Sequence, residues 1–586
     1  MNLSMFLQAV DTLSGTMENE QLISFIHDIA RVLPEGGRDD FLDRMRNCKG
    51  FVDYKKEYDQ EEQRKYEELR EKLEKIESWE LSLAGELNEE YDDWYNSDED
   101  EFLFFDPIGI GKIIECACRF VHEAIDKQIF DKGCEIARIL IGLKIMVGGE
   151  YQDYSGEPLE LEDLERYGLA SIDYKKLVVE SLYLSYVANE LEERADTLYI
   201  MIQNARIKDI SLEMIMQCGE ELPELQQFLP KWMEYLGKQA TYIAQKLLDE
   251  AINLSNDPDD LLKSARAYYE QHPGLYKKYI FENQDKLGYN DLIAVGRECL
   301  DKINQKYLVR SEIALQLADI SLNNNRKITD DVERYWLEAF RSDSRVVNYL
   351  RMMMECSDFS VWKKELQDIN HSHLKQSKGM YYYGYTSSTD LRENVPDYNQ
   401  GYLIEMLNGE YKSVRERGMN YKDALGWSTS FMKNGLAAFL VIFYKGEELT
   451  EGVKTMLTRI VSAVSFSAEE YKKGTLRNQN ANNCELLWVC FGQSREQNPM
   501  SDEEQQRYLS WIEQLVKKRV DGIMEGNHRK YYGECAAYIA ALGEIRESRG
   551  TFNGKQNLML EYKQCYSRRR AFHEELRHFG MKDKKK

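Results

Sequence analysis

The sequence predicts an all-α fold, an α-solenoid of stacked helical hairpins with a long N-terminal amphipathic helix. The 586 residues include 9 prolines against 36 glycines, and 43% of the residues are apolar. So few prolines favour long helices, and a chain of this length exceeds what one hydrophobic core supports. Amphipathic segments of about 12 to 18 residues also follow one another, separated by short turns that contain Gly, Pro, Asn or Asp. Such helices bury their apolar stripes by stacking on their neighbours.

Residues 1–100 are predicted to form an N-terminal helical region with one long, coiled-coil-like helix and an acidic linker. The apolar positions Tyr66, Leu69, Leu73 and Ile76, and then Leu83 and Leu87, follow a three-four spacing. A helix over residues 54–87 would be about 50 Å long. It would serve either as an arm of an intramolecular hairpin or as a coiled-coil contact with a partner. Residues 57–101 contain 19 acidic and 5 basic residues, a net charge of −14, so we place a domain boundary near residue 100.

Residues 101–377 are predicted to form a helical-repeat domain. Small residues at Ala314 and Ala318 on a first helix are followed by Tyr335, Ala339 and Phe340 on a second. This alternation of small and large side chains resembles tetratricopeptide repeats. No 34-residue period recurs, and the turn "NNNRKITDD" is longer than that family uses. The resemblance therefore implies a helical-repeat class and no particular function.

An irregular, tyrosine-rich connection is predicted over residues 378–400, and a second helical-repeat domain with a capping helix over residues 401–586. Irregular connections on a rigid scaffold often carry binding residues. Tyrosine and tryptophan are also favoured anchors in protein interfaces. The residues that we predict to contact a protein partner are Tyr381, Tyr382, Tyr383, Tyr385 and Trp427.

Two motifs resemble known sites without completing them. Cys116, Cys118 and Cys134 resemble the cysteine order of bacterial SWIM zinc fingers, but Ile136 stands where the final histidine belongs. A structural zinc site needs four ligands, so we expect buried core thiols there. "DPIGIGKII" has Asp106 where a phosphate-binding loop needs glycine.

His371 and His373 are expected to lie in a solvent-facing turn. We therefore predict no metal, no cofactor and no complete catalytic set, although an enzyme site assembled from distant helices stays an open alternative.

The basic C-terminal segment offers candidate phosphate contacts. If residues 558–577 form one helix, Lys563, Arg570 and Arg577 share a face about 20 Å long. Glu574 lies among them and weakens the positive field. The favoured interpretation is a capping helix, with Arg569 snorkelling or pairing with an acid of the previous hairpin. The alternative is an edge that contacts nucleic acid.

The charge and the cysteine content of the chain limit its possible functions. Eleven cysteines at irregular spacing argue against a disulfide framework and favour reduced thiols in the cytoplasm. The most apolar run, residues 436–444, is about half as long as a bilayer requires, so no membrane contact is expected. A net charge of −25 opposes general binding to phosphate backbones. We predict a non-enzymatic scaffold for protein–protein interaction. The alternative is an accessory subunit of a nucleic-acid-processing or defence complex.

Overall fold

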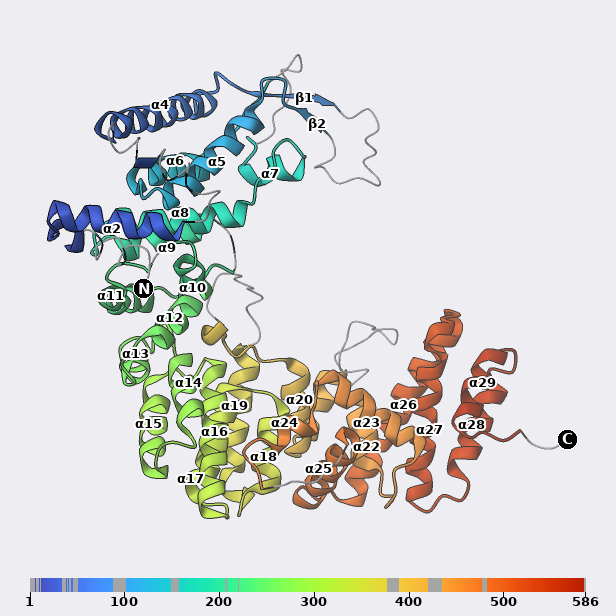
Figure 1. The fold of residues 1–586 in the computed structure, drawn as a ribbon. Helices are drawn as coiled ribbons and strands as arrows, with labels where there is room; N and C mark the ends of the chain where they lie inside the picture. The colour runs from blue at the N-terminus through green and yellow to red at the C-terminus, as the bar shows by residue number, and fades with distance from the viewer. Residues whose placement is uncertain are drawn as a thin grey trace. The chain divides into compact units, whose positions relative to one another are not determined.

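The computed structural model describes most of the chain in several stretches. These are residues 12–33, 51–87, 102–148, 158–376 except 206, 208 and 220, 389–419, 435–476 and 482–583, with single residues between 6 and 45. Helices make up most of these stretches, and the predicted all-α class is confirmed (Figure 1). The chain divides into two compact units: unit 1 comprises residues 1–236 and 243–256, and unit 2 comprises residues 237–242 and 257–586.

Unit 1 contains short and medium helices together with a small sheet. Its helices are α2 (Asn19–Val32), α4 (Phe51–Glu77), α5 (Ile110–Asp126), α6 (Phe130–Gly142), α7 (Leu161–Arg166), α8 (Tyr174–Ala188), α9 (Arg194–Asn204), α10 (Leu212–Met216), α11 (Leu225–Gly237) and α12 (Tyr242–Leu254). Its strands are β1 (Leu83–Leu87), β2 (Phe102–Phe105) and β3 (Val147–Gly148).

The long N-terminal helix is shorter than the sequence predicted. It ends at Glu77, and Trp79 follows with a positive φ of 68°, which a regular helix does not accommodate. Leu83 and Leu87, expected on the helix, instead lie in β1, the central strand of the order β2-β1-β3. Strand β1 pairs antiparallel with β2 and parallel with β3.

Helix α4 packs within its own unit. Tyr66, Leu73 and Ile76 are buried, and the helix contacts α5 and α6. The ammonium of Lys127, the residue that follows the last residue of α5, lies 3.3 Å from the carboxylate of Glu62. Of the two predicted roles of this helix, these contacts correspond to packing within the chain and not to a coiled-coil contact with a partner. They also join residues on both sides of position 100, so the boundary predicted there does not separate two compact units.

Unit 2 is built from helices in the described residues. They are α13 (Asp260–Ala267), α14 (Gly274–Asn283), α15 (Tyr289–Lys302), α16 (Leu308–Asn325), α17 (Asp330–Ser342), α18 (Val346–Glu355), α19 (Phe359–Gln376), η3 (Thr389–Leu391), α20 (Tyr398–Leu407), α21 (Tyr411–Met419), α22 (Leu436–Phe443), α23 (Glu451–Ala463), α24 (Ala468–Lys472), α25 (Asn483–Gln497), α26 (Asp502–Glu525), η5 (Arg529–Tyr531), α27 (Tyr532–Ser548), α28 (Gly554–Cys565) and α29 (Arg570–His578).

The first half of unit 2 stacks in sequence order. Each helix from α13 to α20 contacts the next one (Figure 1). In the pair α16 and α17, the small residues Ala314 and Ala318 and the large residues Tyr335 and Phe340 are all buried. The small–large alternation read from the sequence therefore marks a packed helix pair.

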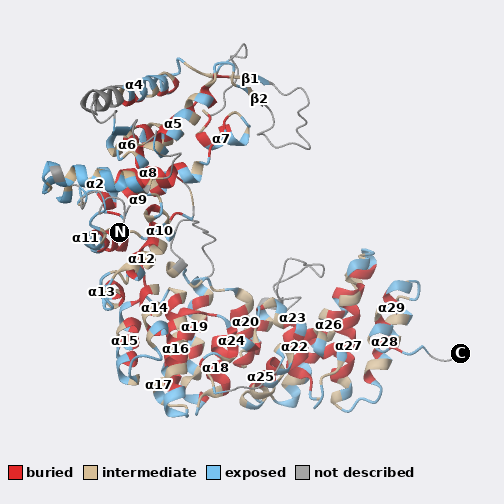
Figure 2. Ribbon diagram, in the orientation of Figure 1, coloured by how far each residue is buried: buried red, intermediate tan, exposed pale blue. Residues whose placement is uncertain are grey.

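The second half of unit 2 is held by contacts between residues far apart in sequence. Helix α22 is buried along its whole length and contacts α23, α25, α26 and α27 (Figure 2). This is the run of residues that was too short to cross a bilayer. No helix in the described stretches combines the length and the apolar character that a membrane span requires.

A fully buried arginine ties α24 to α18. Arg351 donates from Nε to the carbonyl oxygen of Tyr471 at 3.1 Å and also hydrogen-bonds the carbonyl of Glu470. These carbonyls belong to the last turn of α24, where helical partners are missing. Burial lowers the pKa of the Arg351 guanidinium to about 10. The contact joins residues about 120 positions apart, which simple neighbour-to-neighbour stacking does not provide.

Candidate functional site

A helix end in unit 2 places two glutamates side by side. Helix α20 ends at Leu407, and Gly409 follows with a φ of 83°, a conformation that favours glycine. The N–H of Glu410 donates to the carbonyl of Glu405 at 2.9 Å, and the N–H of Gly409 donates to that of Met406 at 3.1 Å. These two bonds form a Schellman motif. The motif reverses the chain and carries Glu410 back beside Glu405.

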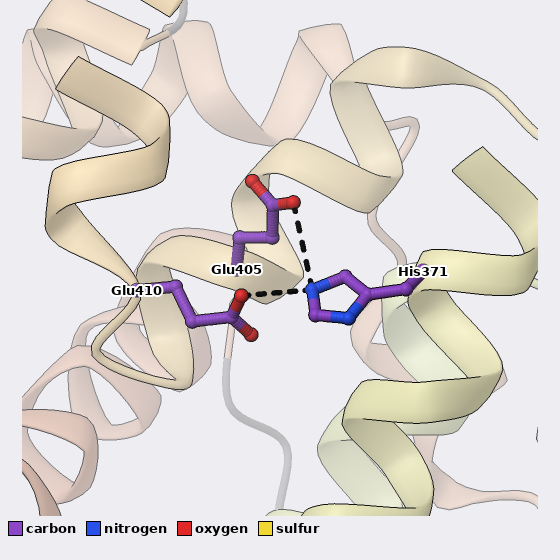
Figure 3. Close-up of side chains that lie close together, drawn as sticks. All are labelled: His371, Glu405 and Glu410. Atoms are coloured by element: carbon purple, nitrogen blue, oxygen red, sulfur yellow. Dashed lines mark hydrogen bonds and ion pairs between the residues drawn. The ribbon is translucent and has the colours of Figure 1, made fainter. Parts of the chain in front are cut away.

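His371 on α19 completes the cluster. Its Nε2 lies 2.8 Å from Oε2 of Glu410 and 3.8 Å from Oε1 of Glu405. Figure 3 shows the two carboxylates converging on this one ring nitrogen. One potential ligand atom from each residue lies within 4.8 Å of the other two. Within the described residues, this is the one group of three His, Cys, Asp or Glu side chains that could hold a metal ion.

The cluster is partly shielded from solvent. The side chain of Glu405 is 3% exposed, that of Glu410 is 20% exposed and that of His371 is 43% exposed. Oε1 of Glu410 is buried and accepts no hydrogen bond from the described residues. Burying a carboxylate is costly unless a positive charge or several donors compensate. The cluster therefore contains largely buried carboxylates, and solvent reaches it on the side of the His371 imidazole.

The ammonium group of Lys363 feels the charge of Glu410 but is hydrogen-bonded to another residue. Lys363, also on α19, donates from Nζ to Oδ1 of Asn498 at 2.6 Å. Burial lowers the pKa of the Lys363 ammonium below its usual range, and the charge of Glu410 acts in the opposite direction. The hydroxyl of buried Tyr349 donates to Oδ1 of Asn408 at 2.7 Å. Burial first, and then the charge of Glu410, raises the pKa of Tyr349.

The solvent-facing turn predicted for His371 and His373 is wrong. Helix α19 continues to Gln376, and residues two apart on a helix point about 200° apart. His373 is therefore buried on the other side, where its Nε2 lies 3.2 Å from the carbonyl oxygen of Arg341 and its ring meets that of Phe340 edge-on. Sequence reasoning missed the partners of His371, because they follow it by 34 and 39 positions.

The five predicted partner contacts lie outside the described residues. This applies to Tyr381, Tyr382, Tyr383, Tyr385 and Trp427. Their role in binding stays a prediction.

The basic C-terminal residues do not share one helix. Helix α28 ends at Cys565 and α29 begins at Arg570, so the seven-residue spacing of Lys563, Arg570 and Arg577 no longer defines a face. Lys563 pairs with Asp583, and Nε of Arg577 lies 3.1 Å from the same carboxylate. Two of the three candidate phosphate contacts are thus engaged within the chain.

Arg569 stabilises the end of a neighbouring helix. It donates from Nη2 to the carbonyl of Met524 and from Nη1 to the amide oxygen of Asn527, both at 2.7 Å. Met524 lies in the last turn of α26, where a cation and a donor are both favourable. The sequence predicts that Arg569 snorkels or pairs with an acid of the previous hairpin, whereas in the structure it caps a helix.

The segment that resembled a phosphate-binding loop carries its own anion. Oδ1 of Asp106 accepts hydrogen bonds from the N–H groups of Gly109 and Ile110, and Oδ2 accepts one from Gly111, each at 2.8 Å. These are donors of the kind that would bind a phosphate at the start of α5. The carboxylate of Asp106 occupies that place.

The three cysteines with a zinc-finger-like order do not come together. Cys116 is exposed and Cys134 is buried, and none of the three belongs to a metal-binding cluster in the described part of the chain. Burial raises the pKa of Cys118 to about 12 and also raises that of Cys134. Thiols with raised pKa values are poor nucleophiles and poor metal ligands.

Helix α2 in unit 1 exposes apolar side chains. None of its described residues is buried, and Ile23 and Phe25 are 55% and 53% exposed. A cavity of about 470 Å³ opens beside it. The apolar residues that line this cavity are Ile23, Ile26, Ala30, Leu33, Phe41 and Met45.

No protein-family model, curated protein or solved structure matches this chain.

Proposed function

We propose that this protein is a non-enzymatic helical scaffold that binds a protein partner through α2. The observation that carries the proposal is the apolar arc of α2, in which Phe25, Ile29, Ile26 and Ile23 span about 160° of the helix. Side chains at both edges of this arc are exposed to solvent. A contiguous exposed apolar patch on a folded protein marks an interaction surface.

The chemistry of this surface favours an amphipathic helix as the partner element. A face of 14 residues is about 21 Å long, which matches three to four turns of a partner helix. The cavity beside Ile23 would accept one large apolar side chain, as in helix-in-groove recognition. His27 and Arg38 at its rim would favour a partner with acidic residues beside that side chain.

The test is a pull-down from native lysate followed by reconstitution with the identified partner. Replacing Ile23 and Ile29 by Asp should abolish retention, because the charges would have to be desolvated in the interface. Phe552→Asp is the matched control, since Phe552 is an exposed apolar residue at 85% exposure in unit 2. A partner retained equally by all three proteins, or no partner for the wild type, would exclude this surface.

The tyrosine-rich segment is tested separately in the same assay. Replacing residues 380–390 by Gly and Ser residues removes the predicted contacts Tyr381, Tyr382, Tyr383 and Tyr385. If these residues also contact the partner, the replacement should weaken its retention while the Phe552→Asp control binds as the wild type does. Unchanged retention would leave α2 as the contact and remove the tyrosines from the proposal.

A further inference from the structure

The cluster of His371, Glu405 and Glu410 brings two carboxylates together around one imidazole nitrogen. The neighbouring ammonium of Lys363 is directed to Asn498. The buried Oε1 of Glu410 has no donor among the described residues. A cation between the carboxylates would satisfy this oxygen.

A second histidine–glutamate pair in the protein has an ammonium group beside its carboxylate. In unit 1, Nδ1 of His122 lies 2.7 Å from Oε1 of buried Glu180. There a single carboxylate meets both the imidazole and the ammonium of Lys176, which lies 3.6 Å away. The pair around His122 therefore has its own cation, and it supplies a natural comparison for the cluster around His371.

The ligand types and their spacing indicate which ion fits. Around a tetrahedral zinc ion with ligands at about 2.1 Å, neighbouring ligand atoms lie about 3.4 Å apart. The distances of 2.8 and 3.8 Å from Nε2 of His371 bracket this value. An imidazole nitrogen with two carboxylates is a ligand set of Zn²⁺, whereas Ca²⁺ and Mg²⁺ prefer oxygen alone.

We propose that His371, Glu405 and Glu410 bind one Zn²⁺ ion. Three protein ligands leave the fourth position to water, which reaches the ion past the half-exposed imidazole. The ion would connect the C-terminal part of α19 to the turn between α20 and α21. Helix α20 contacts both α19 and α21. The proposed zinc site belongs to unit 2, and the proposed partner-binding face on α2 belongs to unit 1.

The experiment is a calorimetric titration of the full-length reduced protein with ZnCl₂ near neutral pH. The wild type should bind one equivalent at this site, and both His371→Ala and Glu410→Gln should weaken that binding at least tenfold. Glu410→Gln keeps the shape of the side chain and remains informative if His371→Ala does not fold. His122→Ala is the matched control, and it should bind zinc as the wild type does.

Cobalt distinguishes this site from the cysteines. Co²⁺ bound to nitrogen and oxygen should show weak ligand-field bands without thiolate charge transfer, and these bands should disappear in Glu410→Gln. A wild type that binds no zinc, or zinc and cobalt binding unaffected by both variants, would overturn the proposal.

Discussion

Glu298 on α15 accepts hydrogen bonds from three side chains that belong to α13, α14 and α15. Nη2 of Arg266 lies 2.9 Å from Oε2, while the hydroxyl of Tyr276 and the ammonium of Lys302 lie 2.7 and 2.9 Å from Oε1. The Arg266 guanidinium, followed by Lys302 and Tyr276, lowers the pKa of Glu298 to about 2. One carboxylate thus holds three successive helices of unit 2 together.

The stability that Glu298 contributes should depend on pH. Its pKa in the unfolded chain is about 4.3, so the contribution is complete above that value and is lost as the pH falls towards about 2. Glu298→Gln should lower the free energy of unfolding by about 1–2 kcal/mol at pH 7, with allowance for solvent screening. Urea unfolding at pH 7 and pH 3 should show this difference shrinking at the lower pH.

The control for Glu298 is another glutamate of unit 2 with a simpler environment. Glu312 forms an exposed ion pair with Lys277, and such pairs contribute little, so Glu312→Gln should change the free energy of unfolding by less than about 1 kcal/mol. If the effect of Glu298→Gln were the same at both pH values, the carboxylate charge would not be its cause.

At the level of elements, the turn after α24 is fixed by hydrogen bonds to both backbone groups of one residue, Gly474. The N–H of Gly474 donates to Oδ1 of Asp319 at 2.8 Å, and its carbonyl accepts from Nε1 of Trp336 at 2.6 Å. Gly474 has a φ of 73°, and a Cβ there would lie 3.3 Å from the carbonyl oxygen of Leu315. The turn therefore depends on glycine for its conformation and for its close approach to α16.

Gly474→Ala should lower the free energy of unfolding by about 1–2 kcal/mol or more, because an alanine at positive φ is strained and its methyl group also crowds α16. Gly550→Ala separates the two causes, since Gly550 has a φ of 92° and nothing within 4 Å of its position for Cβ. Chemical denaturation of both variants measures the difference. A loss for Gly474→Ala no larger than that for Gly550→Ala would show that the contact with α16 adds nothing.

At the scale of the whole molecule, the local spacing of apolar residues predicted the helices. It did not predict which segments far apart in the sequence pair with one another. Ala314 and Ala318 were read correctly as one side of a helix pair, because their spacing is a property of a few turns. Leu83 and Leu87 fit the same helical spacing, yet Leu87 pairs with Phe102, beyond the acidic run, and Leu83 pairs with Val147. Strand pairing depends on residues that a local window does not contain.

The metal-binding cluster and the basic C-terminal segment show the same limit. The turn that brings Glu405 beside Glu410 follows from an Asn-Gly sequence at a helix end, but the position of His371 follows from the packing of α19 on α20. Lys563 and Arg577 were assigned to one face because a continuous helix was assumed. A break between Cys565 and Arg570 changed their geometry, and Asp583 then joined them.

Because each unit has its own buried core, we expect the chain to unfold in two cooperative steps. Leu140 on α6 of unit 1 and Leu457 on α23 of unit 2 are both fully buried. Truncation of either to Ala should cost about 2–5 kcal/mol through lost burial and a residual cavity. Differential scanning calorimetry should show two transitions, with Leu140→Ala lowering the temperature of one and Leu457→Ala that of the other. A single transition that both variants lower equally would mean that the two cores melt as one, and the division of the chain would then have no thermodynamic counterpart.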